Sequence, residues 1–419
     1  MSSKNKPTDT KKEARSGLMP KLRFPEFREE VGWEKRQLSE ITTAIFDGTH
    51  QTPTYTAEGV PFYSVENLVS GNANKFISRT DYEIATKKNK PEKGDVLITR
   101  IGKIGYSQVV TWSHDFSIYV TLAVIKKDGR FDSQFLHQFI QSALYQKEIL
   151  SKSLLSAVPC KINMDSLRAT HVLLASPAEQ QKIAACLSSV DELMAAQARK
   201  VDALKIHKKG LMQQLFPREG KTQPYFRFPE FQNAGGWAKM TLGQAATFYN
   251  GRAYKQEELL ESGKYPVLRV GNFFTSTTWY HSDLELDETK YCENGDLLYA
   301  WSASFGPRIW RGEKSIYHYH IWKVMEQRGI DKQFLFITLE NETENMKAKT
   351  TNGLGIMHIT KGAIESWECT FPTMAEQRKI AGCLTSLDDT ITAESKKLDA
   401  LKTHKEGLMQ RLFPSPDSI

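Results

Sequence analysis

Apolar positions recur every 3.5 residues in two stretches of the chain, residues 178–217 and residues 375–414. Steps of four and three residues alternate along each stretch, interrupted at two polar positions. A strict 3.5-residue period is the signature of a coiled-coil seam, so each stretch is predicted to form one long helix. The seam positions are Ile183, Leu187, Val190, Met194, Gln197, Val201, Leu204, Lys208, Leu211 and Leu215, matched by Ile380, Leu384, Leu387, Ile391, Glu394, Leu398, Leu401, Lys405, Leu408 and Leu412.

Both predicted helices have recognisable ends. Ser176 as N-cap, Pro177 at the first helical position and Glu179 form a capping box, and Thr373 with Glu376 repeats the arrangement. A Phe-Pro pair stops each helix at its far end. At 1.5 Å per residue, a helix of 33 residues is roughly 50 Å long.

The two stretches are copies of each other, with 25 of 40 positions identical at a constant offset of 197 residues. The polar interruptions fall at equivalent positions, and polar seam residues restrict register at a cost in stability. We therefore expect the two helices to pair with each other, antiparallel, with internal pseudo-twofold symmetry. The alternative is an ordinary core helix that occurs twice.

Shorter repeats lie outside the helices. The opening RFPEF...GW occurs at 23–33 and again at 227–237, G-D-x-L occurs at 94–97 and 295–298, and D-x-Q-F-L occurs at 132–136 and 331–335. Between these anchors the two globular segments share little. This contrast indicates that the helices serve one common mechanical role while the globular segments perform two different recognition tasks.

The predicted fold class is α+β: two α/β domains, each followed by a long helix, with the helices paired as an antiparallel coiled coil. Short β-branched or aromatic runs separated by Gly, Asn or Asp turns are typical of such domains. Strands are expected at 60–65, 95–99, 108–111, 118–125, 265–270, 296–301, 307–310 and 316–325, and helices at 134–151 and near 333–347. The expected boundaries are a disordered basic arm (1–19), domain 1 (20–175), helix 1 (176–217), a linker (218–226), domain 2 (227–372), helix 2 (373–414) and a tail (415–419).

Composition narrows the function classes. Lys and Arg outnumber Asp and Glu by 56 to 49, a net charge of +7 that permits a nucleic-acid partner without demonstrating one. Five cysteines stand singly, which indicates a reduced, cytoplasmic protein without a zinc site or disulfide framework. With no apolar run near 18 residues and no apolar segment at the start, we expect neither export nor a membrane span.

Three loops of the first globular segment combine glycine with polar or basic side chains. Histidine, lysine and arginine in such loops can donate to phosphates or to base edges, and glycine lets the backbone approach a ligand closely. The alternatives are a plain hairpin turn and an ordinary surface loop. The candidate DNA-binding residues are Gly48, Thr49, His50, Thr99, Arg100, Lys103 and Lys161.

The second segment carries different side chains in the equivalent loops. Its candidates are Asn250, Arg252, Trp301, Ser302, Ser304, Asn352 and His358. His318 and His320 have the H-x-H spacing of metal ligands, but no third ligand is evident, so they are interpreted as strand histidines and no metal site is predicted.

No catalytic motif is legible. The chain lacks G-x-G-x-x-G after a strand, a P-loop, H-E-x-x-H, G-x-S-x-G and the Asn/Asp-Pro-Pro-aromatic motif of amino-methylating enzymes. A binding protein explains this absence more simply than an enzyme. Two alternatives stay open: a nuclease or methyltransferase with divergent motifs, and a scaffold whose globular segments bind protein.

The paired AEQxKIA and GLMQxLFP motifs, together with the two RFPEF...GW openings, resemble the DNA-specificity subunit of type I restriction-modification systems over nearly the whole chain after residue 20. The resemblance implies two target-recognition domains, each reading half of a bipartite double-stranded DNA target, and a helix pair that sets the spacer. It implies no catalysis and no cofactor in this chain.

The resemblance also implies partners. Two modification subunits would bind S-adenosylmethionine and methylate adenine, and two restriction subunits would use ATP and Mg²⁺ to translocate and cut DNA. Exposed helix positions are candidates for docking the modification subunits, with a solvated helix face as the alternative. These candidates are Gln180, Lys182, Gln377 and Lys379.

Overall fold

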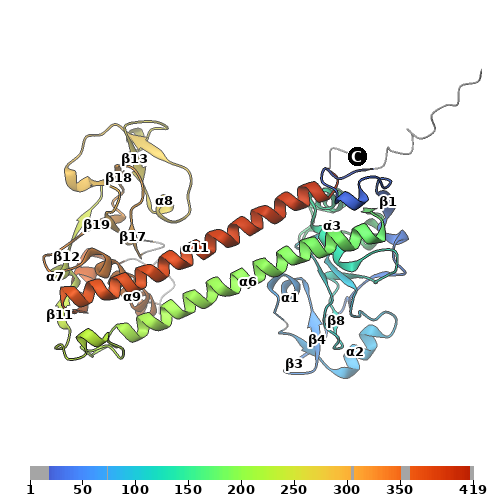
Figure 1. Cartoon of the computed structure of the whole chain (residues 1–419), viewed down its shortest axis with the longest axis horizontal. Coiled ribbons are helices and arrows are strands. Elements are labelled where there is room, and N and C mark those ends of the chain that lie inside the picture. The colour runs from blue at the N-terminus through green and yellow to red at the C-terminus, as the bar shows by residue number, and fades with distance from the viewer. Residues whose placement is uncertain (1–17, 73, 303–305, 351–358, 416–419) are drawn as a thin grey trace, which may run out of the picture. The chain divides into compact units, whose positions relative to one another are not determined.

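The computed structural model describes residues 18–72, 74–302, 306–350 and 359–415 (Figure 1). The chain divides into two compact units, one made of residues up to 198 and from 396 onward, the other of residues 199–395. The predicted basic arm lies outside the described residues except for Leu18 and Met19, and the predicted tail except for Ser415. Each unit combines one globular domain with parts of both long helices.

Unit 1 contains two four-stranded sheets. An antiparallel sheet has the order β2-β9-β6-β7, and a second sheet, β3-β5-β4-β8, includes the parallel pair β4–β8. A two-stranded ladder joins β1 to β10, next to the first long helix. The strands are β1 (Glu34–Gln37), β2 (Ile45–Asp47), β3 (Tyr55–Thr56), β4 (Val60–Tyr63), β5 (Phe76–Ile77), β6 (Val96–Thr99), β7 (Ser107–Val109), β8 (Ser117–Ile118), β9 (Leu122–Ile125) and β10 (His171–Leu174).

The helices of unit 1 cover these sheets and lead into the long helix. They are α1 (Val65–Ser70), α2 (Arg79–Thr86), α3 (Ser133–Gln141), α4 (Ala143–Ser151), α5 (Met164–Arg168) and the first part of α6 (Pro177–Leu215). The helix expected at 134–151 is divided because Ser142 leaves the helical conformation and caps α4, its side chain accepting from Tyr145 N. The strand expected at 118–125 is likewise divided, because the chain turns at 119–121 as it passes from β8 to β9.

Unit 2 repeats the antiparallel sheet and the two-stranded ladder of unit 1, but its second sheet differs, because the parallel pair lies at its centre and not at its edge. Its sheets have the orders β12-β19-β16-β17 and β14-β13-β18-β15, with β13–β18 parallel, and β11 pairs with β20. The strands are β11 (Ala238–Thr241), β12 (Ala246–Asn250), β13 (Tyr265–Leu268), β14 (Tyr280–Ser282), β15 (Tyr291–Cys292), β16 (Leu297–Ala300), β17 (Gly306–Ile309), β18 (Ser315–Tyr317), β19 (Ile321–Glu326) and β20 (Glu368–Phe371). The helices are α7 (Leu242–Ala245), α8 (Val270–Phe274), α9 (Lys332–Thr350), α10 (Lys361–Glu365) and the first part of α11 (Met374–Leu412).

The long helices α6 and α11 pair antiparallel within each unit. In unit 1, Asp191 of the first half of α6 lies 2.7 Å from Lys405 of the last half of α11. In unit 2, Lys208 of the last half of α6 lies 2.7 Å from Asp388 of the first half of α11. Every position of the predicted seam is buried or half-buried. The predicted fold class is therefore confirmed, and the seam lysines are paired with aspartates of the opposite helix.

The repeated motifs meet where each helix begins. In unit 1 the guanidinium of Arg23, in the first RFPEF, donates to the Glu179 carboxylate over 2.6 and 2.8 Å, and both side chains are buried. In unit 2, Arg227 donates to Glu376 over 2.7 Å twice. The glutamates of the two predicted capping boxes thus anchor the preceding domain to its helix.

The Leu-Phe-Pro ends of the helices lie in aromatic cores. Phe413, at the end of α11, packs against Trp33 and Phe135 of unit 1 with ring centroids 6.0 and 5.9 Å apart. Phe216, at the end of α6, packs against Trp237 and Phe334 of unit 2 at 5.8 and 5.5 Å. Each helix is therefore anchored at both ends, its start by one domain and its end by the core of the other unit. No helix in the described part of the chain is apolar enough over a sufficient length to cross a membrane.

Candidate nucleic-acid interface

Arg100 joins the three predicted loops of unit 1. Its guanidinium donates to the Asp47 carboxylate at 3.0 Å, to the carbonyl oxygen of Val120 at 2.9 Å and to that of Ile162 at 3.3 Å. Burial lowers the pKa of Arg100, and the negative charge of Asp47 partly opposes that shift. The side chain is 7% exposed and its Nε and Nη1 groups donate to the protein, so base pairing by Arg100 stays a prediction that would require these bonds to be exchanged.

Two further candidates in unit 1 are structural. Thr99 is fully buried, and its hydroxyl accepts from Tyr106 N at 2.9 Å, so it cannot reach DNA as predicted. Gly48 is required by packing, since a Cβ at this position would lie 2.0 Å from the carbonyl oxygen of Ile118. Thr49 next to it is half-buried and donates to the carbonyl oxygen of Gln51 at 3.1 Å.

The exposed side chains of unit 1 surround the Arg100 junction. His50 is exposed and lies 3.0 Å from Asp47, and Lys103 is exposed over the ring of Tyr106. Lys161 is half-buried, and its backbone forms bridges to Ile101 and Leu154 that tie the second and third loops together. Next to it, Leu154, Leu155 and Val158 are exposed apolar side chains that the sequence did not single out. Base contact by His50, Lys103 and Lys161 stays a prediction.

Trp301 takes the place of Arg100 in unit 2. Its indole nitrogen donates to the carbonyl oxygen of Tyr319 at 2.7 Å, and its backbone oxygen accepts from Ile359 N at 3.2 Å. The indole also stacks on Trp322 at 5.8 Å and meets His320 edge-on at 4.9 Å. Trp301 is half-buried. We call the backbone bonds that join these loops the frame: the bonds of Arg100 to Thr121 and Ile162 in unit 1, and the matching bonds of Trp301 in unit 2. The frame is the same in both units, but aromatic rings surround it in unit 2.

The other candidates of unit 2 are largely committed to internal contacts. Asn250 accepts a hydrogen bond from the Trp322 indole at 2.6 Å, and Arg252 donates to both oxygens of Glu258 at 2.7 and 3.0 Å. Ser302 is buried, which contradicts its prediction as a contact residue. Ser304, Asn352 and His358 lie outside the described residues.

A ring cluster lies at the turn between β18 and β19. His318, Tyr319 and His320 have ring centroids 3.9–4.8 Å apart, and His318 also stacks on Tyr254. Burial lowers the pKa of His318 to about 4, with further lowering by His320 and Arg269, so its imidazole is neutral at pH 7. The sequence analysis interpreted these histidines as strand residues. That prediction is wrong, because both lie in the turn between β18 and β19. The run Tyr-His-Tyr-His was the signal that could have found this cluster, in which Tyr319 is exposed and both histidines are half-buried.

The four predicted docking residues contact their own domains. Gln180 and Gln377 are 1% exposed, which contradicts their prediction as exposed docking positions. Gln180 accepts from Asp132 N at 2.9 Å and Gln377 from Asp331 N at 2.8 Å, so each fixes the D-x-Q-F-L motif to the helix start. Lys182 and Lys379 are exposed but pair with the glutamate of the RFPEF motif, Glu26 and Glu230 respectively, at 3.2 and 3.0 Å. Docking through these two lysines stays a prediction.

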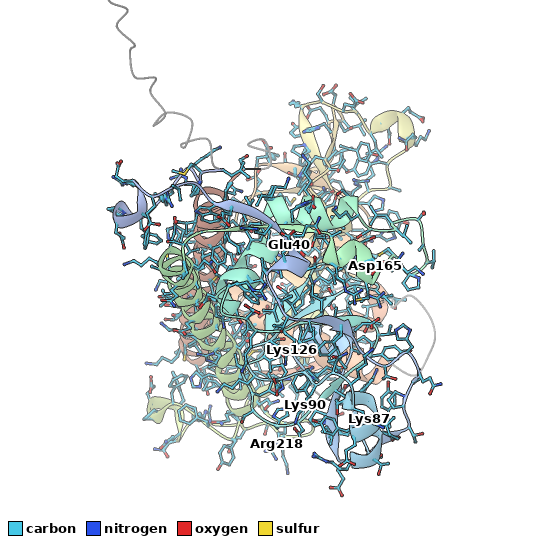
Figure 2. All side chains as sticks on the ribbon, turned by 90° about the vertical axis from the view of Figure 1, so that its right-hand side faces the viewer. Glu40, Lys87, Lys90, Lys126, Asp165 and Arg218 are labelled. Atoms are coloured by element: carbon cyan, nitrogen blue, oxygen red, sulfur yellow. The ribbon has the colours of Figure 1, made fainter. Side chains whose placement is uncertain are left out.

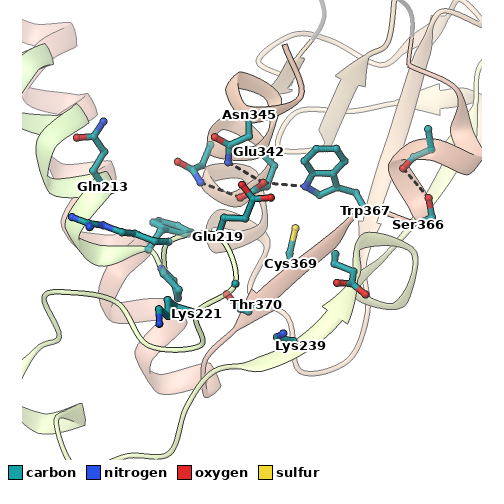
Figure 3. A pocket seen from close by; sticks show the side chains of 17 residues that line it. Gln213, Glu219, Lys221, Lys239, Glu342, Asn345, Ser366, Trp367, Cys369 and Thr370 are labelled. Carbon is teal, nitrogen blue, oxygen red and sulfur yellow. Dashed lines mark hydrogen bonds between the residues drawn. The ribbon is translucent and has the colours of Figure 1, made fainter. Parts of the chain in front are cut away.

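A hollow of about 930 Å³ opens in unit 2 beside the end of α6, the following linker and β20 (Figure 3). Arg218, Lys221 and Lys239 line it opposite Glu342, which accepts hydrogen bonds from Trp367 Nε1 and from two asparagine amides. Its walls mix both charges and include no residue of the predicted loops. Within the described residues no three His, Cys, Asp or Glu side chains are grouped as a metal site would need.

Comparisons with known proteins agree with this architecture. The family model described as type I restriction modification DNA specificity domain matches residues 30–205 and again residues 234–403. The MjaVIII specificity subunit of a type I restriction enzyme from Methanocaldococcus jannaschii is 23% identical over 369 residues, covering 84% of this chain and 85% of that subunit.

Two solved structures share the fold. The S subunit of a type I restriction-modification system from M. genitalium has a TM-score of 0.59 at 17% identity, covering 95% of this chain and all of that one. A chain from a structure on complex assembly and conformational transition of the type I R-M system has a TM-score of 0.55 at 16% identity, with 92% and 98% covered. Since the family model matches most of the chain, and matches it twice, the chain belongs to the type I restriction modification DNA specificity family.

Proposed function

We propose that this chain supplies the DNA sequence specificity of a type I restriction-modification complex in the cytoplasm, each globular domain reading one half of a bipartite target. The observation that carries the proposal is one backbone frame used twice with different side chains at the same place. Arg100 and exposed basic groups occupy the frame in unit 1, whereas Trp301 and the His318–His320 rings occupy it in unit 2. Two surfaces that differ in chemistry suit two different half-sites.

The helix pair would set the distance between the half-sites. Each helix has 39 residues, and an α-helix of that length spans about 58 Å. Successive major-groove faces of B-DNA recur about every 34 Å, so a rod of this size can serve two half-sites along one duplex. The paired Asp191–Lys405 and Asp388–Lys208 contacts support a fixed register, which a spacer-setting device requires.

The chemistry would reside in partner subunits. Two modification subunits, bringing S-adenosylmethionine, would dock on pseudo-twofold equivalent surfaces of the helices, and two restriction subunits would bring ATP and Mg²⁺. Because the glutamine pair is buried and the lysine pair already holds the RFPEF motif, the outward side chains further along the helices are the better docking candidates. In this proposal the chain itself performs no catalysis.

The test is genome-wide adenine methylation in cells that express this chain with its methyltransferase partner, against cells lacking only this chain. A bipartite methylated motif that disappears with the chain is the expected result, and it would supply both half-sites. An unchanged methylation pattern, with expression and assembly verified, would contradict the proposal and favour a protein-binding scaffold.

A further inference from the structure

Residues 87–93, between α2 and β6, form a lysine-rich segment that is anchored to unit 1 through Lys90 and Glu92. Its sequence is Lys-Lys-Asn-Lys-Pro-Glu-Lys. Lys126, just after β9, holds the segment: its Nζ donates to the carbonyl oxygen of Lys90 at 3.1 Å and to the Glu92 carboxylate at 2.8 Å. It also donates to the fully buried Asp95 at 2.8 Å, and Lys90 itself pairs with Asp115. Figure 2 shows Lys126, Lys90 and Lys87 on one face of unit 1.

The remaining lysines of the segment are not neutralised. Lys87, Lys88 and Lys93 are exposed, and their ammonium groups form no hydrogen bond or ion pair with any residue that the structure describes. Three unpaired cations within seven residues of a fixed backbone create a local positive potential. Such a surface attracts a polyanion without reading its sequence.

The segment adjoins the candidate DNA surface. A hollow of about 60 Å³ is lined by Lys88, Thr86 and Asn89 on one side and by Asp47 and Gly48 of the first loop on the other. Asp47 is also the carboxylate that Arg100 holds. Lys88 therefore lies beside the surface that we propose contacts base edges, and Lys87 and Lys93 belong to the same segment. Phosphate contacts beside a base-reading surface position a protein on the duplex.

Unit 2 builds the same frame without these cations. There Lys323 Nζ pairs with Asp296 at 2.7 Å and donates to the carbonyl oxygen of Tyr291 at 3.2 Å, as Lys126 does to Asp95 and Lys90. Aligned through the Gly-Asp pair, Glu288 replaces Lys87 and Asn294 replaces Lys93. Lys314 pairs with Glu288 and Glu293, and Lys290 donates to the backbone of Asn250, so the charges of this segment are satisfied internally.

We propose that the segment 87–93 is a sequence-independent phosphate-binding surface, and that it grips the DNA backbone flanking the half-site read by the first domain only. The inference rests on the proposed function for the identity of its partner, DNA. Its new content is an asymmetry: the two domains share one frame, yet the first contributes phosphate contacts at a place where the second contributes none.

The experiment uses the chain assembled with its methyltransferase partner and measures DNA affinity at several salt concentrations. In the variant K87Q/K88Q/K93Q, each lost phosphate contact lowers the slope of log K against log salt by about 0.9. We expect a total reduction of about 1 to 3, equal on target and non-target duplexes, with the methylated motif unchanged. The variant K35Q/K221Q/K239Q removes the same charge from exposed lysines elsewhere and serves as the control.

Shortening the DNA outside one half-site at a time locates the contact. Trimming the flank of the half-site read by the first domain should weaken the wild-type complex and leave K87Q/K88Q/K93Q unchanged, whereas trimming the other flank should affect both proteins equally. The inference is overturned if the lysine variant keeps the salt slope of the control variant, or if it loses its methyltransferase partner in size-exclusion chromatography, which would assign the surface to a protein. Failure of the wild type to prefer target DNA would instead overturn the proposed function.

Discussion

Arg100 and Trp301 donate to the same carbonyl position of the repeated frame, Arg100 to Val120 at 2.9 Å and Trp301 to Tyr319 at 2.7 Å. The backbone nitrogen and oxygen of both residues also make equivalent bonds, to Thr121 and Ile162 in one domain and to the matching positions in the other. A guanidinium and an indole thus perform one task, which is to hold the loops of each domain in a fixed relation.

Arg100→Met should loosen the first recognition surface. The substitution leaves the Val120 and Ile162 oxygens without their side-chain donor and leaves the Asp47 carboxylate with His50 alone, and we expect a loss of about 2 kcal/mol in the stability of unit 1. Methylation should then lose selectivity at the first half-site while the second half-site is unaffected. Chemical denaturation and methylation sequencing measure these two effects.

Trp301→Phe is the matched control in the second domain, because it removes the N–H that donates to Tyr319 and part of the indole ring that packs on Trp322 and His320, and it should relax the second half-site alone. One other outcome would indicate that Arg100 contacts a base directly. In that case Arg100→Met would abolish binding to the first half-site without any loss of stability.

Glu179→Gln should detach the first domain from the start of α6. Arg23 and Glu179 are both buried, and the hydrogen bond to Glu179 raises the pKa of Arg23. Removing the carboxylate charge therefore leaves the buried Arg23 cation without the counterion that it contacts most closely. Breaking a buried pair of this kind costs about 3 kcal/mol. Hydrogen exchange of residues 20–40 should accelerate relative to the wild type.

Glu26→Gln provides the comparison for this anchor. Glu26 pairs with Lys182 on the surface, where solvent screens the interaction, and we expect a much smaller change. Equal exchange rates in the two variants would show that the Arg23–Glu179 pair does not fasten the domain.

The Asp191–Lys405 pair should favour one register of the helices. The variant Asp191→Lys places a second ammonium group next to that of Lys405, beside Gln138. The double variant D191K/K405D restores the attraction with the two charges exchanged. Since Asp191 is more than a third exposed, we expect a coupling of only about 1 kcal/mol in a double-mutant cycle of unfolding free energies. Additive single-variant effects would exclude a direct interaction between the two side chains.

The sequence predicted features that repeat and missed features that depend on distant contacts. The 3.5-residue seam and the duplicated motifs were legible because a long helix imposes its period on the chain itself. Exposure was not legible: Gln180 has the composition of a solvated helix face but is buried by Asp132, 48 residues away in the chain. Arg100 was interpreted as a base-contacting residue for the same reason, because the sequence around it does not show that Asp47 lies beside it in the fold.

Secondary structure was mispredicted where the chain changes sheets. The run 118–125 has the apolar character of one strand, yet it supplies β8 and β9, and the turn between them is set by bonds from Tyr119 N to Tyr63 and from Leu122 N to Tyr119. In unit 2 the same turn carries His318–His320, so these three clustered rings were wrongly assigned to a strand.

Inserting one heptad after Ala198 and another after Ser395 should lengthen the permitted spacer and leave both half-sites unchanged. These positions are equivalent in the two helix copies, and seven residues preserve the seam because they equal two turns of its period. The insertion adds about 10 Å of helix, which limits the increase to roughly 3 base pairs. Methylation sequencing of cells carrying the variant measures the spacer directly. Insertion into α6 alone is the control, since it shifts one helix against the other and should destabilise the pair, and an unchanged spacer in the double insertion would contradict the role of the helices in setting it.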